Sequence, residues 1–470
     1  MNVNRLNSIE ELLNQQAEFF SHKIDSLAFA ICMDKIDPLA KFQDKFHIPT
    51  VSDVLEGVGI DKNALKNNTE SDDTAIYFNG NSLGLQSKLS EEYLNSEMEK
   101  WAKWGSIGYF KSRSQNDLMW SRSEDHLKEG CADLIGAKKD DVACLNSVTV
   151  NLHLLFISFY RPTKERFMIL MEDKAFPSDF YAVESQIRLK GYDPKHTLIC
   201  LKPREGEHCL RNDDIIENIK NLGNKIALVF LSSVHYYTGA LLDMETITTA
   251  GKIMGCYVGW NLTHGIGNVK MNINDWNVDF AIWSSYKYLN GGPGCIAGMY
   301  VNEKYKHNDF PKLLGWFGHK YETRFIMNNV FDPEPSPDIY KISNSPALYV
   351  SLLRASLKIF QEATMDKIVE KSYLLTGYLY YLLKTSSFYK KYFEIITPED
   401  PSKRGNQLSI LFNSFLDVKM IYKELTNNGV VCDIREPNVI RIAPAPLYNT
   451  FRQVYRFCFI LSNILVKTQK

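Results

Sequence analysis

The sequence predicts an α/β protein with a mostly parallel sheet flanked by helices and a smaller α/β lobe near the C-terminus. Three observations lead to this fold class. Short apolar runs alternate with amphipathic stretches from Ala75 onward, a proline-rich segment interrupts the chain at 332–337, and further strand-like runs follow it. At 470 residues the chain is too long for one simple core, so two lobes of unequal size are expected.

The elements of the larger lobe are justified in chain order. The first seventy or so residues are charged and helical in pattern, starting with a capping-box motif at 8–11. Further along, 226–231 has the pattern of a buried strand, 244–254 that of a helix, and 256–260 and 279–284 those of two more strands. Strand, helix and strand in alternation indicate a parallel sheet with crossover helices, whose ligands collect at the carboxyl ends of the strands.

The smaller lobe is expected after the proline-rich segment 332–337, which we interpret as a lobe boundary or an active-site loop. A long helical pattern covers 346–383, and three strand-like runs cover 407–412, 430–434 and 439–442. The predicted domains are an N-terminal helical segment at 1–75 that packs on the small lobe, a large cofactor-binding domain at 76–340 and a small C-terminal domain at 341–470.

Composition narrows the classes of partner. The 54 basic and 55 acidic side chains nearly balance, which argues against nucleic acid and against an anionic membrane surface. No apolar run reaches the roughly 18 residues of a membrane helix, and the N-terminus is not an apolar signal segment, so we expect a cytoplasmic protein that acts on small molecules. The nine cysteines are scattered and the histidines are not clustered, so no metal site is expected.

Lys287 is the main candidate for chemistry. It lies between the apolar run 279–283 and a glycine-rich turn at 291–292. A lysine at the mouth of a buried strand can be desolvated enough to lose its proton and condense with an aldehyde, which is how pyridoxal phosphate is anchored. Most lysines are solvated surface groups, so the surrounding segments decide the interpretation.

Three segments before Lys287 carry suitable partners for such a cofactor. Residues 147–151 precede an apolar helical stretch, where hydroxyls and backbone amides can meet a phosphate, although an ordinary helix cap has the same pattern. Residues 175–179 place an aromatic ring beside a carboxylate, which alone is also typical of a turn. Residues 259–265 end a strand with Asn261, which could face a ring nitrogen, and His264, which alone is more often a structural histidine.

Together these segments resemble kynureninase. The matching blocks run from 77–84 to 441–448 and include 149–153, 202–207, 285–290 and 315–319. The resemblance covers nearly the whole chain. It implies a fold-type I pyridoxal-phosphate enzyme that works as a homodimer and hydrolyses kynurenine or 3-hydroxykynurenine to an anthranilate and alanine.

The resemblance also implies roles for individual residues. Lys287 would bind the cofactor covalently and shuttle protons, and Arg441 would grip the substrate's α-carboxylate, although outside this context an arginine there would indicate a surface ion pair. Trp316 and Asn344 would reach the site of the neighbouring subunit. The remaining cofactor contacts would be Val148, Thr149, Phe176, Ser178, Asp179, Ser232, Asn261, His264 and Tyr286. The substrate contacts would be Ser82, Tyr109, Phe317, Ser343, Asn344 and Arg441.

Two features depart from the family pattern. Kynureninases carry aspartate at the position of Asn261, where the carboxylate pairs with the protonated ring nitrogen. A charged hydrogen bond contributes roughly 1.5 to 3 kcal/mol against roughly 0.5 to 1.5 for a neutral one, so Asn favours the unprotonated ring by about tenfold or more, and Asn261→Asp is expected to raise activity. Tyr109 stands where the family has histidine, and the segment 110–119 that follows it is longer than usual.

Three functions are therefore considered. The first is a kynureninase that is slow or has shifted substrate preference. The second is a pyridoxal-phosphate enzyme of another reaction type, such as β-elimination, which depends less on a protonated ring. The third is a protein that binds the cofactor and an aromatic metabolite without turnover.

Overall fold

A computed structural model of the chain describes residues 9–60, 73–114, 117 and 119–468. Ser8, the first residue of the predicted capping box, lies outside these ranges. The chain forms two compact units. Unit 1 comprises Met1–Lys88, Tyr237–Leu241 and Glu362–Lys470, and unit 2 comprises Leu89–Tyr236 and Leu242–Gln361.

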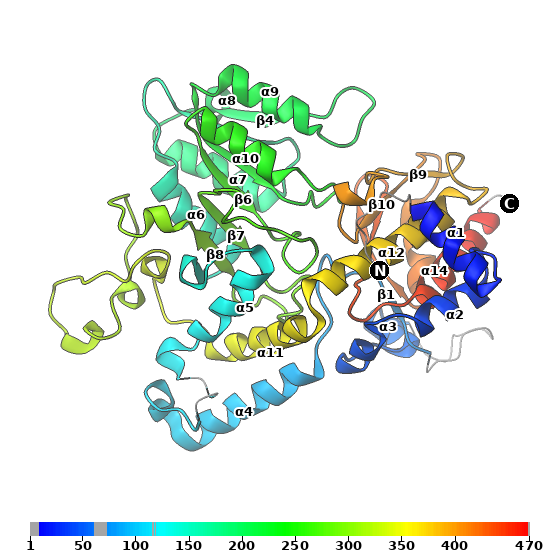
Figure 1. Ribbon diagram of the computed structural model, residues 1–470, viewed down its shortest axis with the longest axis horizontal. Coiled ribbons are helices and arrows are strands. Elements are labelled where there is room, and N and C mark those ends of the chain that lie inside the picture. Colours follow the sequence, from blue (N-terminus) through cyan, green and yellow to red (C-terminus); the bar gives the residue numbers. More distant parts are fainter. Residues whose placement is uncertain (1–8, 61–72, 115–116, 118, 469–470) are drawn as a thin grey trace. The chain divides into compact units, whose positions relative to one another are not determined.

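Unit 2 is built on a seven-stranded sheet with the order β2-β8-β7-β6-β5-β3-β4 (Figure 1). The five strands from β7 to β4 are parallel, and β8 pairs antiparallel with both β7 and β2, so the expected mostly parallel sheet is confirmed. The strands are β2 Val142–Cys144, β3 Met168–Glu172, β4 Leu198–Leu201, β5 Ile226–Ser232, β6 Tyr257–Asn261, β7 Phe280–Trp283 and β8 Gly298–Val301.

Helices bury the sheet of unit 2. Every residue of β7 and β8 is buried, as expected for strands covered on both faces. Helix α6 packs on β7 and β8, and α10 packs on β6. The helices are α4 Lys88–Trp104, α5 Asp125–Ile135, α6 Val148–Phe159, α7 Pro177–Leu189, α8 Pro194–Thr197, α9 Asn212–Leu222, α10 Met244–Ile253 and α11 Ala347–Ala363.

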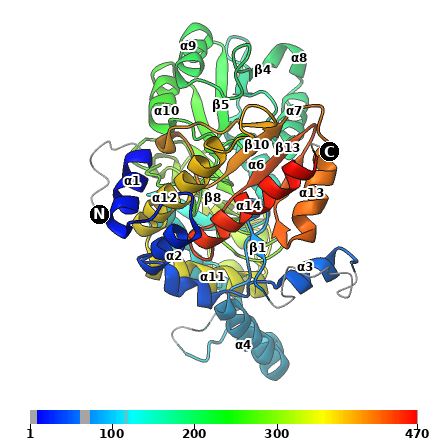
Figure 2. The same ribbon diagram turned by 90° about the vertical axis from the view of Figure 1, so that its right-hand side faces the viewer.

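Unit 1 has its own core. Its four-stranded antiparallel sheet has the order β12-β13-β10-β9, and β1 pairs in parallel with β11. Helix α14 packs against α2, α12 and α13 (Figure 2). The strands are β1 Ile76–Tyr77, β9 Phe393–Ile395, β10 Leu408–Phe412, β11 Val430–Val431, β12 Asp433–Arg435 and β13 Val439–Ile442, and the helices are α1 Ile9–Phe20, α2 Leu27–Lys35, α3 Val51–Gly57, α12 Met365–Lys384, α13 Val418–Asn427 and α14 Phe451–Lys467.

Three details differ from the sequence-based expectation. The last boundary between the two units falls after Gln361 and not in the proline-rich segment. Helix α11 belongs to unit 2, which it contacts through, for example, the hydrogen bond from Ser356 to the carbonyl of Leu289. The helical pattern 346–383 is two helices, since Thr364 takes a left-handed φ of 64° between them. The run 430–434 is divided between β11 and β12, which pair in different sheets.

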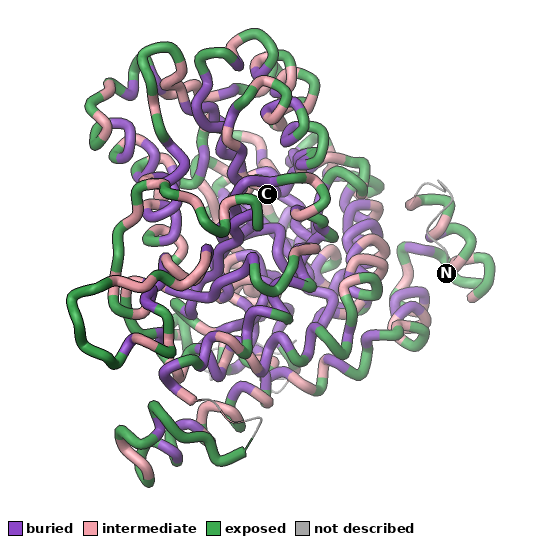
Figure 3. The backbone as a smooth tube through the Cα atoms, turned by 60° about the vertical axis from the view of Figure 1, so that its left-hand side comes forward, coloured by how far each residue is buried: buried purple, intermediate pink, exposed green. Residues whose placement is uncertain are grey.

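Burial follows this architecture. Buried backbone lies inside each unit, and exposed backbone follows the outer loops and helix faces (Figure 3). Within the described ranges, no helix combines the length and the apolar character that crossing a membrane requires. The carboxyl ends of β3, β5 and β6 meet at one edge of the unit 2 sheet, which is where a parallel sheet places its ligands.

Candidate active site

A cavity of about 130 Å³ lies at this edge and contains Lys287. Lys287 follows β7, and its Nζ lies 2.8 Å from Nε2 of His264, which follows the neighbouring strand β6. The same Nζ is 5.6 Å from the centre of the Phe176 ring and 5.9 Å from that of Tyr286. The amine is therefore held between an imidazole and two aromatic rings.

Two helices begin at the cavity. Val148 and Thr149 lie in the first turn of α6, and Ser178 and Asp179 lie in the first turn of α7. Oγ1 of Thr149 and Oγ of Ser178 are 2.8 Å apart, so the two helix starts bring their hydroxyls together. Backbone N–H groups at helix N-termini favour anions. This corner of the cavity therefore suits a phosphate.

Asn261 closes the cavity at the end of β6. Its Nδ2 donates to Oδ2 of Asp179 at 2.5 Å, and its Oδ1 accepts from the backbone N–H of Thr263 at 2.9 Å. Asp179 is 4% exposed. Burial raises the pKa of Asp179 to about 6, and the hydrogen bond from Asn261 and the charge of Lys287 oppose that rise.

A buried carboxylate at the end of β3 was missed by the sequence analysis. The side chain of Glu172 accepts from the backbone N–H of Ser232, with its two oxygens at 3.2 and 3.4 Å. Burial raises the pKa of Glu172 to about 7. Its place after the apolar run 168–171 could have identified it, because the neighbouring strand ends carry Ser232 and Asn261.

Most of the predicted cofactor residues are brought together. The cavity is also lined by three residues that were not predicted, Val234, Tyr236 and Thr263. Tyr236 packs edge-to-face on Phe176, with ring centres 5.3 Å apart. The predicted residues that line the cavity are Val148, Thr149, Phe176, Ser178, Asp179, Ser232, Asn261, His264, Tyr286 and Lys287.

Five other predicted residues of unit 2 lie outside this lining. Trp316, Ser343 and Asn344 are exposed, and Phe317 is half-buried. Nδ2 of Asn344 donates to the hydroxyl of Tyr109 at 3.4 Å. Two of the residues predicted to touch substrate therefore touch each other.

Tyr109 lines a second, more apolar cavity of about 530 Å³. Its ring packs edge-to-face on Trp120, with centres 5.6 Å apart, and its carbonyl accepts from Ser121. The other lining residues are Trp101, Gly105, Ser106, Pro346, Ala347, Leu348 and Tyr349.

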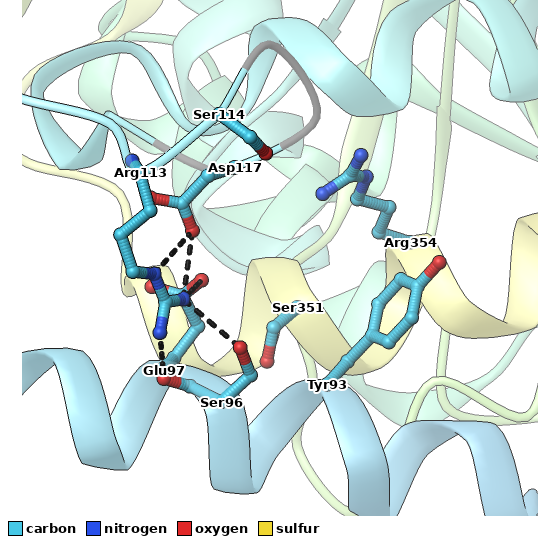
Figure 4. Close-up of a pocket in the computed structure, with 8 residues that line it drawn as sticks. All are labelled: Tyr93, Ser96, Glu97, Arg113, Ser114, Asp117, Ser351 and Arg354. Carbon is cyan, nitrogen blue, oxygen red and sulfur yellow. Dashed lines mark hydrogen bonds and ion pairs between the residues drawn. The ribbon is translucent and has the colours of Figure 1, made fainter.

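The longer segment after Tyr109 is fastened to α4 by charged groups. Arg113 Nη2 contacts Asp117 Oδ1 at 2.8 Å and Ser96 Oγ at 2.9 Å (Figure 4). Lys100, which is buried, contacts the other oxygen of Asp117 at 2.9 Å. Although burial opposes it, hydrogen bonding from Arg113 and Lys100 lowers the pKa of Asp117 to about 2. The described part of the segment is thus held in place on α4.

Two predicted substrate residues belong to unit 1. Ser82 is half-buried in the turn that follows β1. Arg441 lies on β13, is 1% exposed, and pairs with Asp433 at 2.8 Å. The ion pair of Arg441 is therefore not a surface ion pair, because its guanidinium is buried and Asp433 is only partly exposed.

Comparison with known proteins identifies the family. Kynureninase of Rattus norvegicus is 46% identical over 447 residues, covering 94% of each chain. Kynureninase of Homo sapiens is 45% identical and covers 96% of this chain and 95% of the human one. The chain belongs to the kynureninase family. The family profile described as "Kynureninase C-terminal domain" also matches residues 368–461.

Solved structures show that the kynureninase-family chain has the fold of the fold-type I pyridoxal-phosphate enzymes. A cysteine desulfurase from Escherichia coli aligns with a TM-score of 0.70 at 14% identity, covering 91% of this chain and 98% of that one. A cysteine desulfurase from Thermococcus onnurineus aligns with a TM-score of 0.67 at 17% identity, covering 84% and 95%. The cofactor of the chain is pyridoxal phosphate. The cavity fits this group, since it combines an amine, two helix N-termini with hydroxyls, and an aromatic ring.

Proposed function

We propose that the chain hydrolyses L-kynurenine or 3-hydroxykynurenine to alanine and the corresponding anthranilate. The observation that carries this proposal is Lys287, held 2.8 Å from His264 in a cavity that also contains two helix N-termini. The kynureninases of rat and man, which match nearly end to end, support the same reaction. In the overall change, one water adds to the carbonyl beside the ring, the Cβ–Cγ bond breaks, and Cβ takes a proton to become the methyl group of alanine.

Each residue of the site has a proposed role that follows from its chemistry. When bound, pyridoxal phosphate withdraws electrons from the substrate's α-carbon. Lys287 would provide the amine that binds the cofactor aldehyde and would carry the α-proton, while His264 contacts its Nζ. Thr149 and Ser178 would hold the phosphate, and Phe176 would lie against the ring. The resemblance assigns the substrate's carboxylate to Arg441, which belongs to unit 1 and whose guanidinium fork pairs with Asp433 in this structure.

A homodimer with shared sites belongs to the same proposal. The segment 313–330 exposes apolar side chains that a monomer would leave in water, including Trp316 at 49%, Ile326 at 62%, Met327 at 77% and Val330 at 68%. An apolar patch of this kind favours contact with a second copy of the chain. In that dimer, Trp316 and Asn344 would serve the neighbouring site. The cytoplasmic location expected from the sequence stays a prediction.

The reaction is tested by adding either substrate to the purified protein. Alanine release together with anthranilate fluorescence, both absent from Lys287→Ala, is the expected result. Release of pyruvate and ammonia from other amino acids would favour β-elimination instead. Cofactor binding and kynurenine binding without any product would favour the non-catalytic alternative.

The shared site is tested by mixing two inactive variants, Lys287→Ala and Asn344→Ala, and letting their subunits exchange. If each site needs both chains, random pairing restores about a quarter of the parent's sites, because half of the dimers are mixed and each holds one intact site. No recovery in a mixture shown to contain mixed dimers would contradict the shared site.

A further inference from the structure

The amide of Asn261 is fixed in one orientation. Its Oδ1 faces the backbone N–H of Thr263, which can only donate, and its Nδ2 faces the carboxylate of Asp179, which accepts when ionised. Turning the amide over would place two donors against each other at Thr263 and two acceptors against each other at Asp179. The surroundings therefore assign the orientation without ambiguity.

Charges in the cavity are few. Of the thirteen described residues that line it, Asp179 is the only carboxylate and Lys287 is the only amine. Their opposite charges interact, since the charge of Lys287 favours the ionised form of Asp179. Glu172 lies behind the lining, where it accepts from the N–H of Ser232. Asp179 and Lys287 are thus the one acid and the one amine among the described lining residues.

We propose that Asp179 and Asn261 act as one unit whose single negative charge is on Asp179, and that this unit binds pyridoxal phosphate with its ring nitrogen unprotonated. The inference rests on the proposed function only in taking the cofactor to occupy this cavity. Asn261 offers no carboxylate to a pyridinium proton, and the charge of Asp179 is already matched by the positive nitrogen at Lys287. Asp179 is therefore a positioning residue for Asn261 and a counterion for Lys287.

The contact between Asn261 and Asp179 makes Asn261→Asp a poor test of the charge at position 261. An aspartate at position 261 would put two carboxyl groups 2.5 Å apart. Carboxyl groups this close cannot both be ionised, so the two would share one proton. Asn261→Asp alone thus adds a second carboxylate, as the family pattern has at these two positions, and does not show which of the two carries the charge. The charge can be moved instead by the exchange Asp179→Asn with Asn261→Asp, which keeps one carboxylate, one amide and a hydrogen bond between them.

The decisive experiment measures the ring nitrogen directly. The apoprotein is loaded with pyridoxal phosphate labelled with ¹⁵N in the ring, and the ¹⁵N chemical shift is recorded from pH 6.5 to 8.5. The parent is expected to show the shift of an unprotonated pyridine throughout. The exchanged pair is expected to show that of a protonated one. A protonated ring in the parent would overturn the proposal, as would the same protonation state in the parent and the exchanged pair.

Two variants at Asp179 separate its charge from its hydrogen bond. Asp179→Asn keeps an acceptor for Asn261 and removes the charge, whereas Asp179→Ala removes both. Loss of a nearby opposite charge should lower, by about one unit or more, the pH at which the visible absorbance of the Lys287-linked cofactor changes. Both variants should show this shift, and Glu172→Gln, which removes a buried carboxylate behind the lining, should show a smaller one. An unchanged pH midpoint in Asp179→Asn would contradict the counterion role.

The proposal and the proposed function fail in different ways. If the protein binds no cofactor at Lys287, both are lost. If it binds the cofactor covalently and releases alanine from kynurenine while its ring nitrogen is protonated, the proposed function stands and this inference is wrong.

Discussion

Nζ of Lys287 and Nε2 of His264 lie 2.8 Å apart. Lys287 lies in the segment that follows β7, and His264 lies in the segment that follows β6. These strands are neighbours in the sheet, with Asn261 paired opposite Ile282. The short segments that follow the two strands therefore deliver an amine and an imidazole to the same point. This placement follows from the strand order within unit 2, to which both residues belong.

Replacing Lys287 should abolish the chemistry while leaving the fold. We expect Lys287→Ala to lower alanine release by about 10² to 10⁴-fold or more, since both proton transfer and cofactor attachment are lost. Lys164→Ala, which removes an exposed lysine, serves as the matched control. Borohydride reduction followed by peptide mapping should fix the cofactor to Lys287 in the parent and the control. Equal activity in Lys287→Ala and Lys164→Ala would refute this assignment.

His264 should affect the proton transfer by Lys287 without being essential for it. A hydrogen bond to a charged group contributes about 1.5 to 3 kcal/mol, so His264→Ala is expected to reduce kcat by roughly ten- to a hundredfold. His264→Gln keeps a polar group near the amine and should recover part of the loss. The pH dependence of kcat should also shift in His264→Ala. An unchanged pH profile together with an unchanged rate would show that His264 is structural only.

The two hydroxyls at the helix starts should affect cofactor affinity. Thr149→Val and Ser178→Ala each remove one donor from the corner that suits the phosphate. Each change is expected to weaken cofactor binding about tenfold, as measured by titrating the apoprotein, with little effect on unfolding. The double variant should weaken it by less than the product, because the hydroxyls contact each other. Parent-like affinity in the double variant would place the phosphate elsewhere.

Glu172 should make stability fall as pH rises. Its pKa is about 7 in the folded protein against an ordinary 4.5, so the folded state holds the proton more tightly than the unfolded state. The resulting stability is complete below about pH 4.5 and is lost as the pH rises to about 7. Glu172→Gln keeps an acceptor for the N–H of Ser232 but has no proton to lose. At pH 8 the free energy of unfolding of the apo variant should therefore exceed that of the parent by about 3 kcal/mol. Urea unfolding at pH 5 and pH 8 measures this, and a pH-independent difference would contradict it.

Much of the larger unit could be predicted from sequence because its strands are short apolar runs between clear breakers. The strands at 226–231, 256–260 and 279–284 were found for this reason, and ten cofactor residues could be placed from local segments and resemblance together. What escaped prediction depends on tertiary contacts. The hydrogen bond between Asn261 and Asp179 joins residues 82 positions apart, and the role of Glu172 depends on its neighbour Ser232 on β5.

The helix break at Thr364 and the division of 430–434 between two strands were not predicted, for a similar reason. Thr364 interrupts a helical pattern without a glycine or proline to mark the site, although its φ is positive. Val430 and Val431 pair with β1, which is separated from them by more than 350 residues, while Asp433 pairs with β13. Local patterns contain no information on which distant strand a run will join.

The central claim is that Lys287 forms a covalent imine with pyridoxal phosphate in the cavity at the edge of the unit 2 sheet. The most direct measurement adds the cofactor to purified apoprotein and to Lys287→Ala and follows the visible absorbance before and after borohydride. The account predicts a visible band that borohydride removes and that Lys287→Ala lacks. A parent protein that stays colourless, or a band that is unchanged in Lys287→Ala, would contradict it.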